Sequence, residues 1–301
     1  MINSSTHNQN LVLSDNSITL SIKREDLIHP FISGNKYRKL KYNIQEAQSL
    51  KLKSLLTFGG AFSNHIAAVA YAGKTYGFKT IGVIRGDELR EKKDLNPTLE
   101  FAKSCGMEFK FVTREAYRNK NNTDYITSLR NQFGNFYLIP EGGTNELAVK
   151  GCEEILAEQD EQFDYICCSV GTGGTISGII NSVKTHQKVL GFPALKGDFL
   201  QQDIRKFANQ ENWELITDYH FGGYGKIKPE LITFVNTFKN DYNIPLDPIY
   251  TGKMMFGLFH LIEQGFFAKD SKILAIHTGG LQGIAGVNSV LKRKNLPLIE
   301  I

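Results

Sequence analysis

Short apolar runs alternate along this chain with longer stretches in which apolar residues recur every three or four positions. The short runs are typical of buried strands and the longer stretches of amphipathic helices. Strands are predicted at Ser54–Phe58, Lys79–Ile84, Glu108–Val112, Phe136–Ile139, Tyr165–Ser169, Lys188–Phe192, Thr217–Phe221 and Ile273–His277. Helices are predicted at Lys36–Leu50, Asn64–Tyr76, Thr144–Glu158 and Thr175–Thr185. This alternation predicts an α/β fold in which parallel sheets are covered by helices.

The spacing of the strands predicts two domains. The first four predicted strands lie close together, as in a compact unit of their own. We therefore expect a small domain, residues 49–149, inserted into a larger one formed by residues 1–48 and 150–301. Several predicted strands end in loops rich in Gly, Ser and Thr, and ligands of open sheets bind beyond such strand ends. Residues 194–214 lack clear periodicity and are predicted to be a surface excursion.

The charge of the chain argues against nucleic acid as a partner. The formal net charge is only +4 over 301 residues, and no run of Lys and Arg stands out. Such a small positive excess suits an anionic small molecule equally well.

Cysteine usage and the N-terminal sequence favour a soluble, cytoplasmic protein. Four cysteines, of which Cys167 and Cys168 are adjacent in an apolar run, form neither a disulfide framework nor paired metal-ligand spacing. The first ten residues are polar, and no apolar run approaches the roughly 20 residues that span a bilayer. We expect neither a metal nor a membrane partner.

One lysine stands among small and polar residues. Lys36 belongs to the segment 33–39, Ser-Gly-Asn-Lys-Tyr-Arg-Lys, and the turn at 58–65, Phe-Gly-Gly-Ala-Phe-Ser-Asn-His, follows downstream. An amine, a hydroxyl and an amide beside glycine turns suggest a carbonyl cofactor held covalently by the amine. Most lysines with basic neighbours are simply solvated, so this role requires a lowered pKa, for which Arg38 and Lys39 could supply the charges. Ser63 could equally be the N-cap of the following helix.

A second glycine-rich segment resembles a phosphate-binding turn. Gly171, Thr172, Gly173, Gly174 and Thr175 follow a predicted strand and precede a predicted helix. Backbone N–H groups and hydroxyls converge on an anion in such turns. No Lys-Ser/Thr pair follows, which argues against a nucleoside triphosphate loop, and a dinucleotide site lacks its glycine pattern. A turn that binds nothing is the alternative.

Three further loops follow in the last third of the chain. They lie at residues 219–225, 247–253 and 277–281, and the first two carry Tyr224 and Tyr250. Isolated tyrosines are more often core residues than functional ones. His277 has no neighbour at metal-ligand spacing and is expected to be structural.

Taken in order, these loops resemble the pyridoxal-phosphate enzymes of the tryptophan-synthase-β type, and within them the 1-aminocyclopropane-1-carboxylate deaminase and D-cysteine desulfhydrase family. The matching segments are 23–26, 34–40, 59–65, 171–175, 224–225, 250–253 and 277–280, which span nearly the whole chain. The resemblance implies a fold of two parallel-sheet αβα domains with pyridoxal 5'-phosphate in the cleft between them. It also implies a homodimer, as in relatives.

The resemblance implies roles for individual residues. Lys36 matches the lysine that binds the cofactor covalently, Asn64 the asparagine at its phenolic oxygen, and residues 171–175 its phosphate loop. Ser63 matches a serine that binds substrate carboxylate or carries a proton. Tyr224 and Tyr250 match two active-site tyrosines, and His65 stands beside the substrate where relatives commonly carry glutamine.

Two positions bear on the branch of the family. The deaminases carry a glutamate near the pyridine nitrogen where this chain has Thr251, and a leucine where it has Thr278. Both threonines match the D-cysteine desulfhydrase branch. A carboxylate at that nitrogen makes the ring a strong electron sink, which helps to open a cyclopropane. Neutral hydroxyls suit elimination of a good leaving group.

We therefore expect β-elimination from D-cysteine to pyruvate, ammonia and sulfide. Lys36 or Ser63 would take the Cα proton, with Tyr224 or Tyr250 as general acid. The alternatives are 1-aminocyclopropane-1-carboxylate deamination to 2-oxobutyrate, a serine or threonine dehydratase or racemase, a catalytically idle cofactor-binding protein, and a bare nucleotide-binding module.

Overall fold

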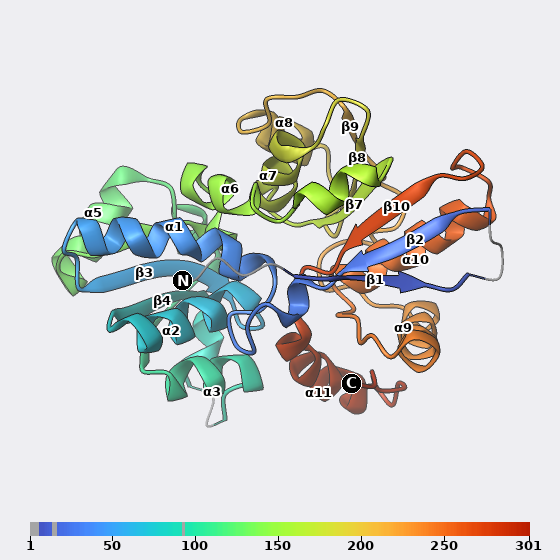
Figure 1. Ribbon diagram of the computed structural model, residues 1–301. Coiled ribbons are helices and arrows are strands. Elements are labelled where there is room, and N and C mark those ends of the chain that lie inside the picture. The colour runs from blue at the N-terminus through green and yellow to red at the C-terminus, as the bar shows by residue number, and fades with distance from the viewer. Residues whose placement is uncertain (1–5, 14–16, 92–93) are drawn as a thin grey trace.

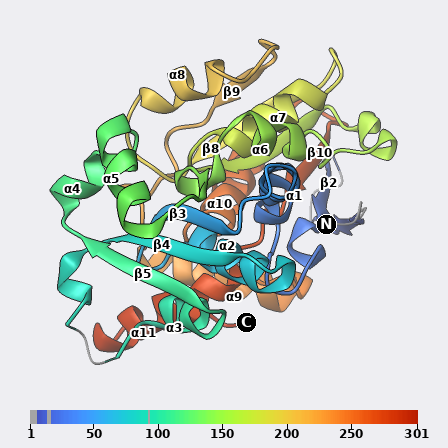
Figure 2. The same ribbon diagram turned by 90° about the vertical axis from the view of Figure 1, so that its left-hand side faces the viewer.

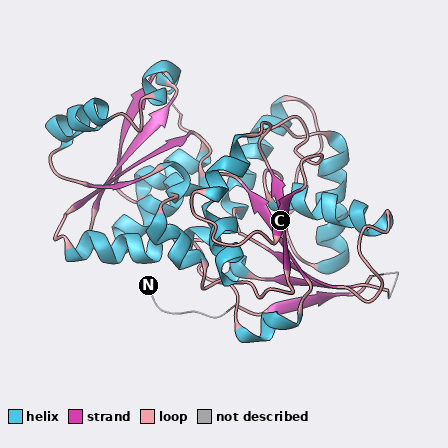
Figure 3. Ribbon diagram, turned by 90° about the horizontal axis from the view of Figure 1, so that it is seen from above, coloured by secondary structure: helices cyan, strands magenta, loops and turns pink. Residues whose placement is uncertain are grey.

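The computed structural model describes residues 6–13, 17–91 and 94–301 and contains two sheets. Residues 1–5 of the polar N-terminal segment lie outside the described residues. Figure 3 shows the two sheets apart from each other, each wrapped by helices. None of the helices that the structure describes is long and apolar enough to cross a membrane.

The larger sheet has six strands in the order β1-β2-β10-β7-β8-β9. All neighbours pair in parallel except β1 and β2. The strands are β1 (Asn8–Leu11), β2 (Thr19–Lys23), β7 (Tyr165–Val170), β8 (Lys188–Pro193), β9 (Trp213–Leu215) and β10 (Lys272–Ile276).

The smaller sheet has four parallel strands in the order β5-β4-β3-β6. They are β3 (Ser54–Gly60), β4 (Lys79–Arg85), β5 (Met107–Val112) and β6 (Tyr137–Ile139). Figure 2 shows β3, β4 and β5 side by side. The predicted class, α/β with parallel sheets, is confirmed.

Helices cover both faces of both sheets, as parallel sheets require (Figure 1). They are α1 (Asn35–Ser49), α2 (Asn64–Tyr76), α3 (Pro97–Ser104), α4 (Arg114–Arg118), α5 (Thr123–Phe133), α6 (Glu146–Cys152), α7 (Gly174–Ser182), α8 (Phe199–Arg205), α9 (Pro229–Tyr242), α10 (Thr251–Glu263) and α11 (Ile284–Arg293). One core cluster joins α9, α10 and α11 to the larger sheet, and another joins α7 and α8 to it. Helices α1, α2 and α3 share a cluster with the smaller sheet, whose other cluster contains residues of α4 and α5.

The packing of α1 bears on the predicted domain division, which remains a prediction. Leu40 and Ile44 of this helix lie in the same core cluster as Leu55 of β3 and Ile66 of α2. A division drawn from packing would therefore place α1 with the smaller sheet.

The strand predicted at residues 217–221 is wrong. The structure has turns there, and the edge strand of the sheet is β9, a few residues earlier. The aromatic side chains that suggested a strand pack on α10 instead: the rings of Phe221 and Phe256 lie 5.0 Å apart, and Tyr219 covers Gly257.

The surface excursion predicted for residues 194–214 is also wrong in part. This segment contains α8 and most of β9, and Leu200 and Ile204 of α8 are buried. The predicted helix 144–158 is shorter than expected, because α6 ends at Cys152. Strands β1 and β2 escaped prediction because they are short and partly polar.

Candidate active site

The start of α1 is fixed against the end of β10. Gly34 has φ +60°, and a Cβ there would lie 1.9 Å from the carbonyl oxygen of Thr278. The next backbone N–H, of Asn35, donates to the same oxygen at 3.2 Å. A glycine is required because only it tolerates both the positive φ and so close a neighbour. The sequence Gly-Asn-Lys therefore places Lys36 beside the C-terminal end of a strand in the larger sheet.

The Lys36 amine has the electrostatic environment of a nucleophile. Burial, and then the positive charge of Lys39, lower the pKa of Lys36 to about 7. Its Nζ lies 3.4 Å from Oδ1 of Asn35. At neutral pH a large fraction of this amine is therefore uncharged and able to attack a carbonyl.

The turn at residues 171–175 lies where a phosphate could be held. It connects β7 to the N-terminus of α7, and the hydroxyl of Thr175 accepts a bond of 2.8 Å from Nδ2 of Asn35. Glycine at 173 is required by its φ of +83°. The helix N-terminus and the hydroxyls favour an anion.

Lys39 supplies a cation to this turn, a contact that the sequence alone did not assign. Its Nζ donates to the hydroxyl of Thr144 at 3.0 Å, to the carbonyl of Gly142 at 3.1 Å and to the hydroxyl of Thr172 at 3.4 Å. Its side chain is buried, and no carboxylate of the described residues forms an ion pair with it. Spacing gave a signal: Lys39 is one helical turn from Lys36 and shares its face.

Arg38, considered above as a source of charge for Lys36, points elsewhere. Its guanidinium donates to both carboxylate oxygens of Glu25, at 2.9 and 2.8 Å, and lies 4.0 Å from Glu154. Its charge is balanced by these carboxylates, whereas Lys39 is the cation that lowers the pKa of Lys36.

The turn between β3 and α2 brings Ser63 and Asn64 to the same region. The hydroxyl of Ser63 accepts from the N–H of Ile66 at 3.3 Å, so Ser63 is the N-cap of α2. Oδ1 of Asn64 is buried and has no hydrogen-bond partner among the described residues. Its Nδ2 would lie 2.7 Å from a Cβ on Gly280, which places Asn64 beside the loop after β10. An unpartnered buried oxygen at this point indicates room for a polar ligand.

His65 is buried against strand β3, next to the turn that carries Ser63 and Asn64. Its Nε2 is 2.8 Å from the hydroxyl of Thr57, which itself donates to the carbonyl of Ile139 at 2.8 Å. The imidazole Nε2–H therefore donates to Thr57. Burial, followed by the charges of Lys36 and Lys39, lowers the pKa of His65 well below its usual value, so the ring is neutral. It is not among the residues that line the cavity described next.

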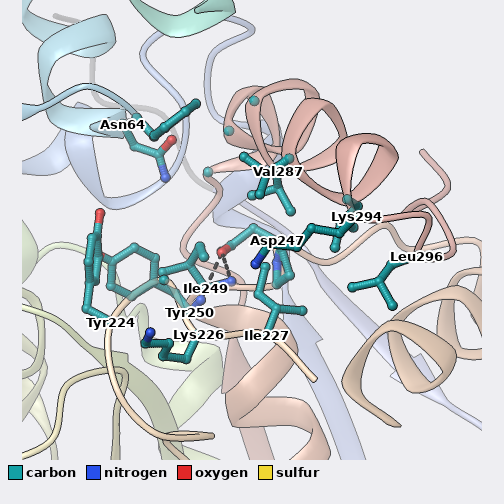
Figure 4. A pocket seen from close by; sticks show the side chains of 18 residues that line it. Asn64, Tyr224, Lys226, Ile227, Asp247, Ile249, Tyr250, Val287, Lys294 and Leu296 are labelled. Atoms are coloured by element: carbon teal, nitrogen blue, oxygen red, sulfur yellow. Dashed lines mark hydrogen bonds between the residues drawn. The ribbon is translucent and has the colours of Figure 1, made fainter. Parts of the chain in front are cut away.

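Tyr224 and Tyr250 face a cavity of about 280 Å³ together with Asn64 (Figure 4). Their rings meet edge to face, with centroids 6.2 Å apart. Loss of surrounding water raises the pKa of both phenols, although Tyr224 is 45% exposed, and both carry their proton at neutral pH. Lys253 stabilises the loop that carries Tyr224, because its Nζ donates to the carbonyls of His220 and Gly223 at 2.9 Å.

The two threonines have different surroundings. The hydroxyl of Thr278 lies 3.1 Å from that of Ser169 at the ends of β10 and β7. The hydroxyl of Thr251 instead accepts from the N–H of Asp247 at 3.0 Å and lies 3.3 Å from its carboxylate. Ser169 and Thr278 thus form a buried neutral pair near the site.

Asp247 is a lining residue that sequence reasoning missed. Its carboxylate accepts from the backbone N–H groups of Ile249, Tyr250 and Thr251 at 2.8, 2.8 and 3.2 Å. Burial raises its pKa, and these N–H bonds oppose the shift. An aspartate that precedes a helix reads as an ordinary cap, so its position gave no functional signal.

Together these groups match the chemistry of one cofactor. An amine of lowered pKa suits its carbonyl, a threonine-rich helix N-terminus with Lys39 suits its phosphate, and the unpartnered amide of Asn64 suits a ring hydroxyl. A lysine of lowered pKa beside a glycine- and threonine-rich turn, in a fold of two largely parallel sheets, points to the class of fold type II pyridoxal-phosphate enzymes.

Comparison with known proteins agrees. Residues 9–279 match the family model described as pyridoxal-phosphate dependent enzyme, and this chain belongs to that family. Its cofactor is pyridoxal 5'-phosphate.

Its relatives carry the names of the family that the loops resemble, most often that of the deaminase. A Thermotoga maritima protein named as a candidate 1-aminocyclopropane-1-carboxylate deaminase is 32% identical over 285 residues, covering 87% of this chain and 89% of that protein. The mitochondrial bifunctional D-cysteine desulfhydrase/1-aminocyclopropane-1-carboxylate deaminase of Arabidopsis thaliana is 30% identical, covering 92% and 76%. A crystal structure described as an ACC deaminase homologue superposes with a TM-score of 0.83 at 29% identity, covering 96% of this chain and 94% of that one. The chain is an enzyme of this deaminase and desulfhydrase group.

Proposed function

We propose that the chain catalyses β-elimination from D-cysteine, yielding pyruvate, ammonia and hydrogen sulfide. The observation that carries the proposal is that threonines, Thr251 and Thr278, stand at the two positions that separate the branches, and that the Thr278 hydroxyl lies 3.1 Å from that of Ser169. The deaminases that the sequence resembles place a carboxylate near the pyridine nitrogen. A site with hydroxyls favours reactions in which a good leaving group departs.

The cofactor and the chain have separate tasks. When bound, pyridoxal 5'-phosphate supplies a carbonyl for the substrate amine and a ring that withdraws electrons from the α-carbon. Lys36 would hold that carbonyl until the substrate amine takes its place, and the freed Lys36 amine, with a pKa of about 7, would then be the base for the Cα proton. Ser63 is less suited, because among the described residues its hydroxyl bonds only to the N–H of Ile66, as the N-cap of α2.

Tyr224 and Tyr250 are the candidate general acids, because both line the cavity with Asn64 and each phenol carries a proton at neutral pH. Their raised pKa makes each a weaker acid, so the proton passes only as negative charge develops on the departing sulfur. The Cβ–S bond breaks with its electron pair on sulfur, and water then releases pyruvate and ammonia. Lys39 and the residues 171–175 hold the phosphate, and Asn64 the ring hydroxyl.

A keto-acid assay over D-cysteine, L-cysteine, D-serine and 1-aminocyclopropane-1-carboxylate tests the proposal. We expect pyruvate and sulfide from D-cysteine, with the highest kcat/KM of the set. Greater formation of 2-oxobutyrate from the cyclopropane substrate would instead establish the deaminase reaction, the second candidate, which the names of the relatives favour.

The variant Thr251→Glu tests the basis of the choice. In the resembling deaminases a glutamate occupies this position, and we expect the variant to lose D-cysteine activity by about 10-fold or more. Thr233→Glu, at an exposed position of α9, is the matched control for an added carboxylate.

A further inference from the structure

The cavity at Tyr224 and Tyr250 extends well beyond the groups assigned to the reaction. Asn64 and the two tyrosines line one end, and Val287 and Leu296 line the other (Figure 4). Its volume of about 280 Å³ is close to the roughly 300 Å³ at which pockets for drug-sized ligands begin. D-Cysteine carries only a CH₂–SH group beyond its α-carbon and would leave the far end empty.

The far end, which we call the apolar arm, is lined by Ile227, Val287, Val290, Leu291 and Leu296. Asp247 is the one carboxylate among the described lining residues, and three backbone N–H groups already occupy it. Lys226 and Lys294 also line the cavity, but both are exposed and can extend into water. The apolar arm therefore offers contact to hydrocarbon and few partners to a polar group.

The apolar arm is continuous with the substrate end through one loop. Phe62 lines the cavity and directly precedes Ser63 and Asn64. A Cβ on Gly286 of α11 would lie 2.6 Å from the Phe62 ring, so the glycine lets this ring close against the helix. The loop that carries the substrate residues thus also forms a wall of the apolar arm.

We propose that the apolar arm receives a hydrocarbon group attached to the sulfur of the substrate, so that the preferred substrates are S-alkyl or S-aryl D-cysteines. This proposal rests on the β-elimination proposed above. The Cα proton passes to Lys36, the Cβ–S bond breaks with its electrons on sulfur, and the sulfur takes a proton to leave as a thiol. Water completes the release of pyruvate and ammonia.

Binding of unreactive amino acids to the holoenzyme tests the apolar arm separately from the reaction. D-Norleucine and D-alanine share a head group and lack a leaving group, and calorimetry gives the Kd of each. We expect D-norleucine to bind at least about 10-fold more tightly, since each buried CH₂ contributes to affinity. Equal affinities would overturn the proposal, even if D-cysteine is turned over.

Val290→Trp, which fills the apolar arm, should bring the ratio of the two Kd values close to one. Ser289→Trp adds the same ring at an exposed neighbouring position outside the cavity and should keep the wild-type ratio. The wild-type ratio remains decisive if Val290→Trp fails to fold.

Turnover separates the two proposals. We expect kcat/KM for pyruvate from S-propyl-D-cysteine to exceed that from D-cysteine by about 10-fold. Turnover of D-cysteine with no gain from the propyl group would overturn the apolar arm alone. Tight D-norleucine binding with no pyruvate from either thiol or thioether would support the arm and overturn the proposed β-elimination.

Discussion

At the scale of residues, the site depends on two lysines one helical turn apart. The Lys39 amine donates to uncharged oxygens at 3.0 to 3.4 Å and no carboxylate of the described residues pairs with it, while burial lowers its pKa. Burial and the charge of Lys39 lower the pKa of Lys36 to about 7. We therefore propose that the same cation both attracts an anion and activates the Lys36 amine.

The pH dependence of cofactor loading follows from this pair. The rate at which pyridoxal phosphate modifies the apoprotein should rise with pH through about 7 and level off above it, because only the uncharged Lys36 amine attacks. In Lys39→Met the midpoint should move to higher pH, since the removed charge is one that lowers the Lys36 pKa. Stopped-flow absorbance measures both midpoints, and an unmoved midpoint in the variant would refute the coupling.

Lys39 should also determine affinity for the cofactor. Hydrogen bonds to charged groups contribute about 1.5–3 kcal/mol, so Lys39→Met should raise the Kd of the cofactor by about 10-fold to 100-fold. Lys41→Met is the matched control: that lysine bonds to Glu154 at 2.6 and 2.8 Å, away from the phosphate turn. Fluorescence titration of the apoproteins compares the two, and equal affinities would contradict the assignment.

At the scale of elements, close contacts of backbone with backbone place the functional side chains. The first turn of α1 approaches the end of β10 at Gly34, and α1 crosses α6 where a Cβ on Gly151 would lie 2.0 Å from the carbonyl of Arg38. Such contacts explain why the candidate residues come together although they are far apart in the sequence.

Gly34→Ala should displace Lys36. The substitution combines a positive φ with a Cβ that overlaps the Thr278 carbonyl, so we expect it to lower the free energy of unfolding by at least about 3 kcal/mol and to weaken the cofactor spectrum. Gly77→Ala also has a positive φ, +75°, but open space around its Cβ, and should cost only about 1–2 kcal/mol with the spectrum intact. Denaturant melts and absorbance compare them; equal losses would show that the contact is unimportant.

A buried lysine supports the loop of Tyr224. Lys253→Met keeps the aliphatic stem but leaves the carbonyls of His220 and Gly223 without their donor, which should cost about 1–3 kcal/mol and reduce kcat. Lys228→Met, an exposed position nearby, is the control for a lost positive charge. A variant with wild-type kcat would show that this lysine does not position the tyrosine.

The sequence predicted the parallel strands and the order of the loops because buried strands and helices need apolar residues at regular intervals. It could not predict the contacts of side chains whose pattern fits both a strand and a loop packed on a helix. The aromatic residues Tyr219 and Phe221 satisfy a strand pattern, yet their rings pack on α10. Thr251 was assigned from its place after a tyrosine, whereas its hydroxyl bonds to Asp247, an interaction set by local geometry.

At the scale of the whole molecule, the site joins the two sheets. Asn64 and Lys36 lie in the first turns of helices that share a core with the smaller sheet, whereas Thr175 and Thr278 follow strands of the larger one. Asn35 already links them through its bonds to Thr175 and Thr278. A cofactor held by all of these groups would stabilise both sheets together.

Removal of the cofactor should therefore lower the melting temperature of the entire chain. A ligand at about 100 times its Kd adds about 2.7 kcal/mol to the free energy of unfolding. A shift of about 2–4 °C accompanies each kcal/mol in chains of about 150–250 residues, so we expect the apoprotein to melt at least about 5 °C below the holoenzyme. Added pyridoxal phosphate should restore the melting temperature of the wild-type apoprotein. It should raise the melting temperature of Lys36→Ala by less, because that variant keeps the phosphate contacts but cannot bind the carbonyl covalently.

The number of calorimetric transitions tests whether the site is shared. A single transition that moves as a unit with added cofactor would agree with a site shared by both sheets. Two transitions of which only one moves would mean that the cofactor is held by one sheet alone.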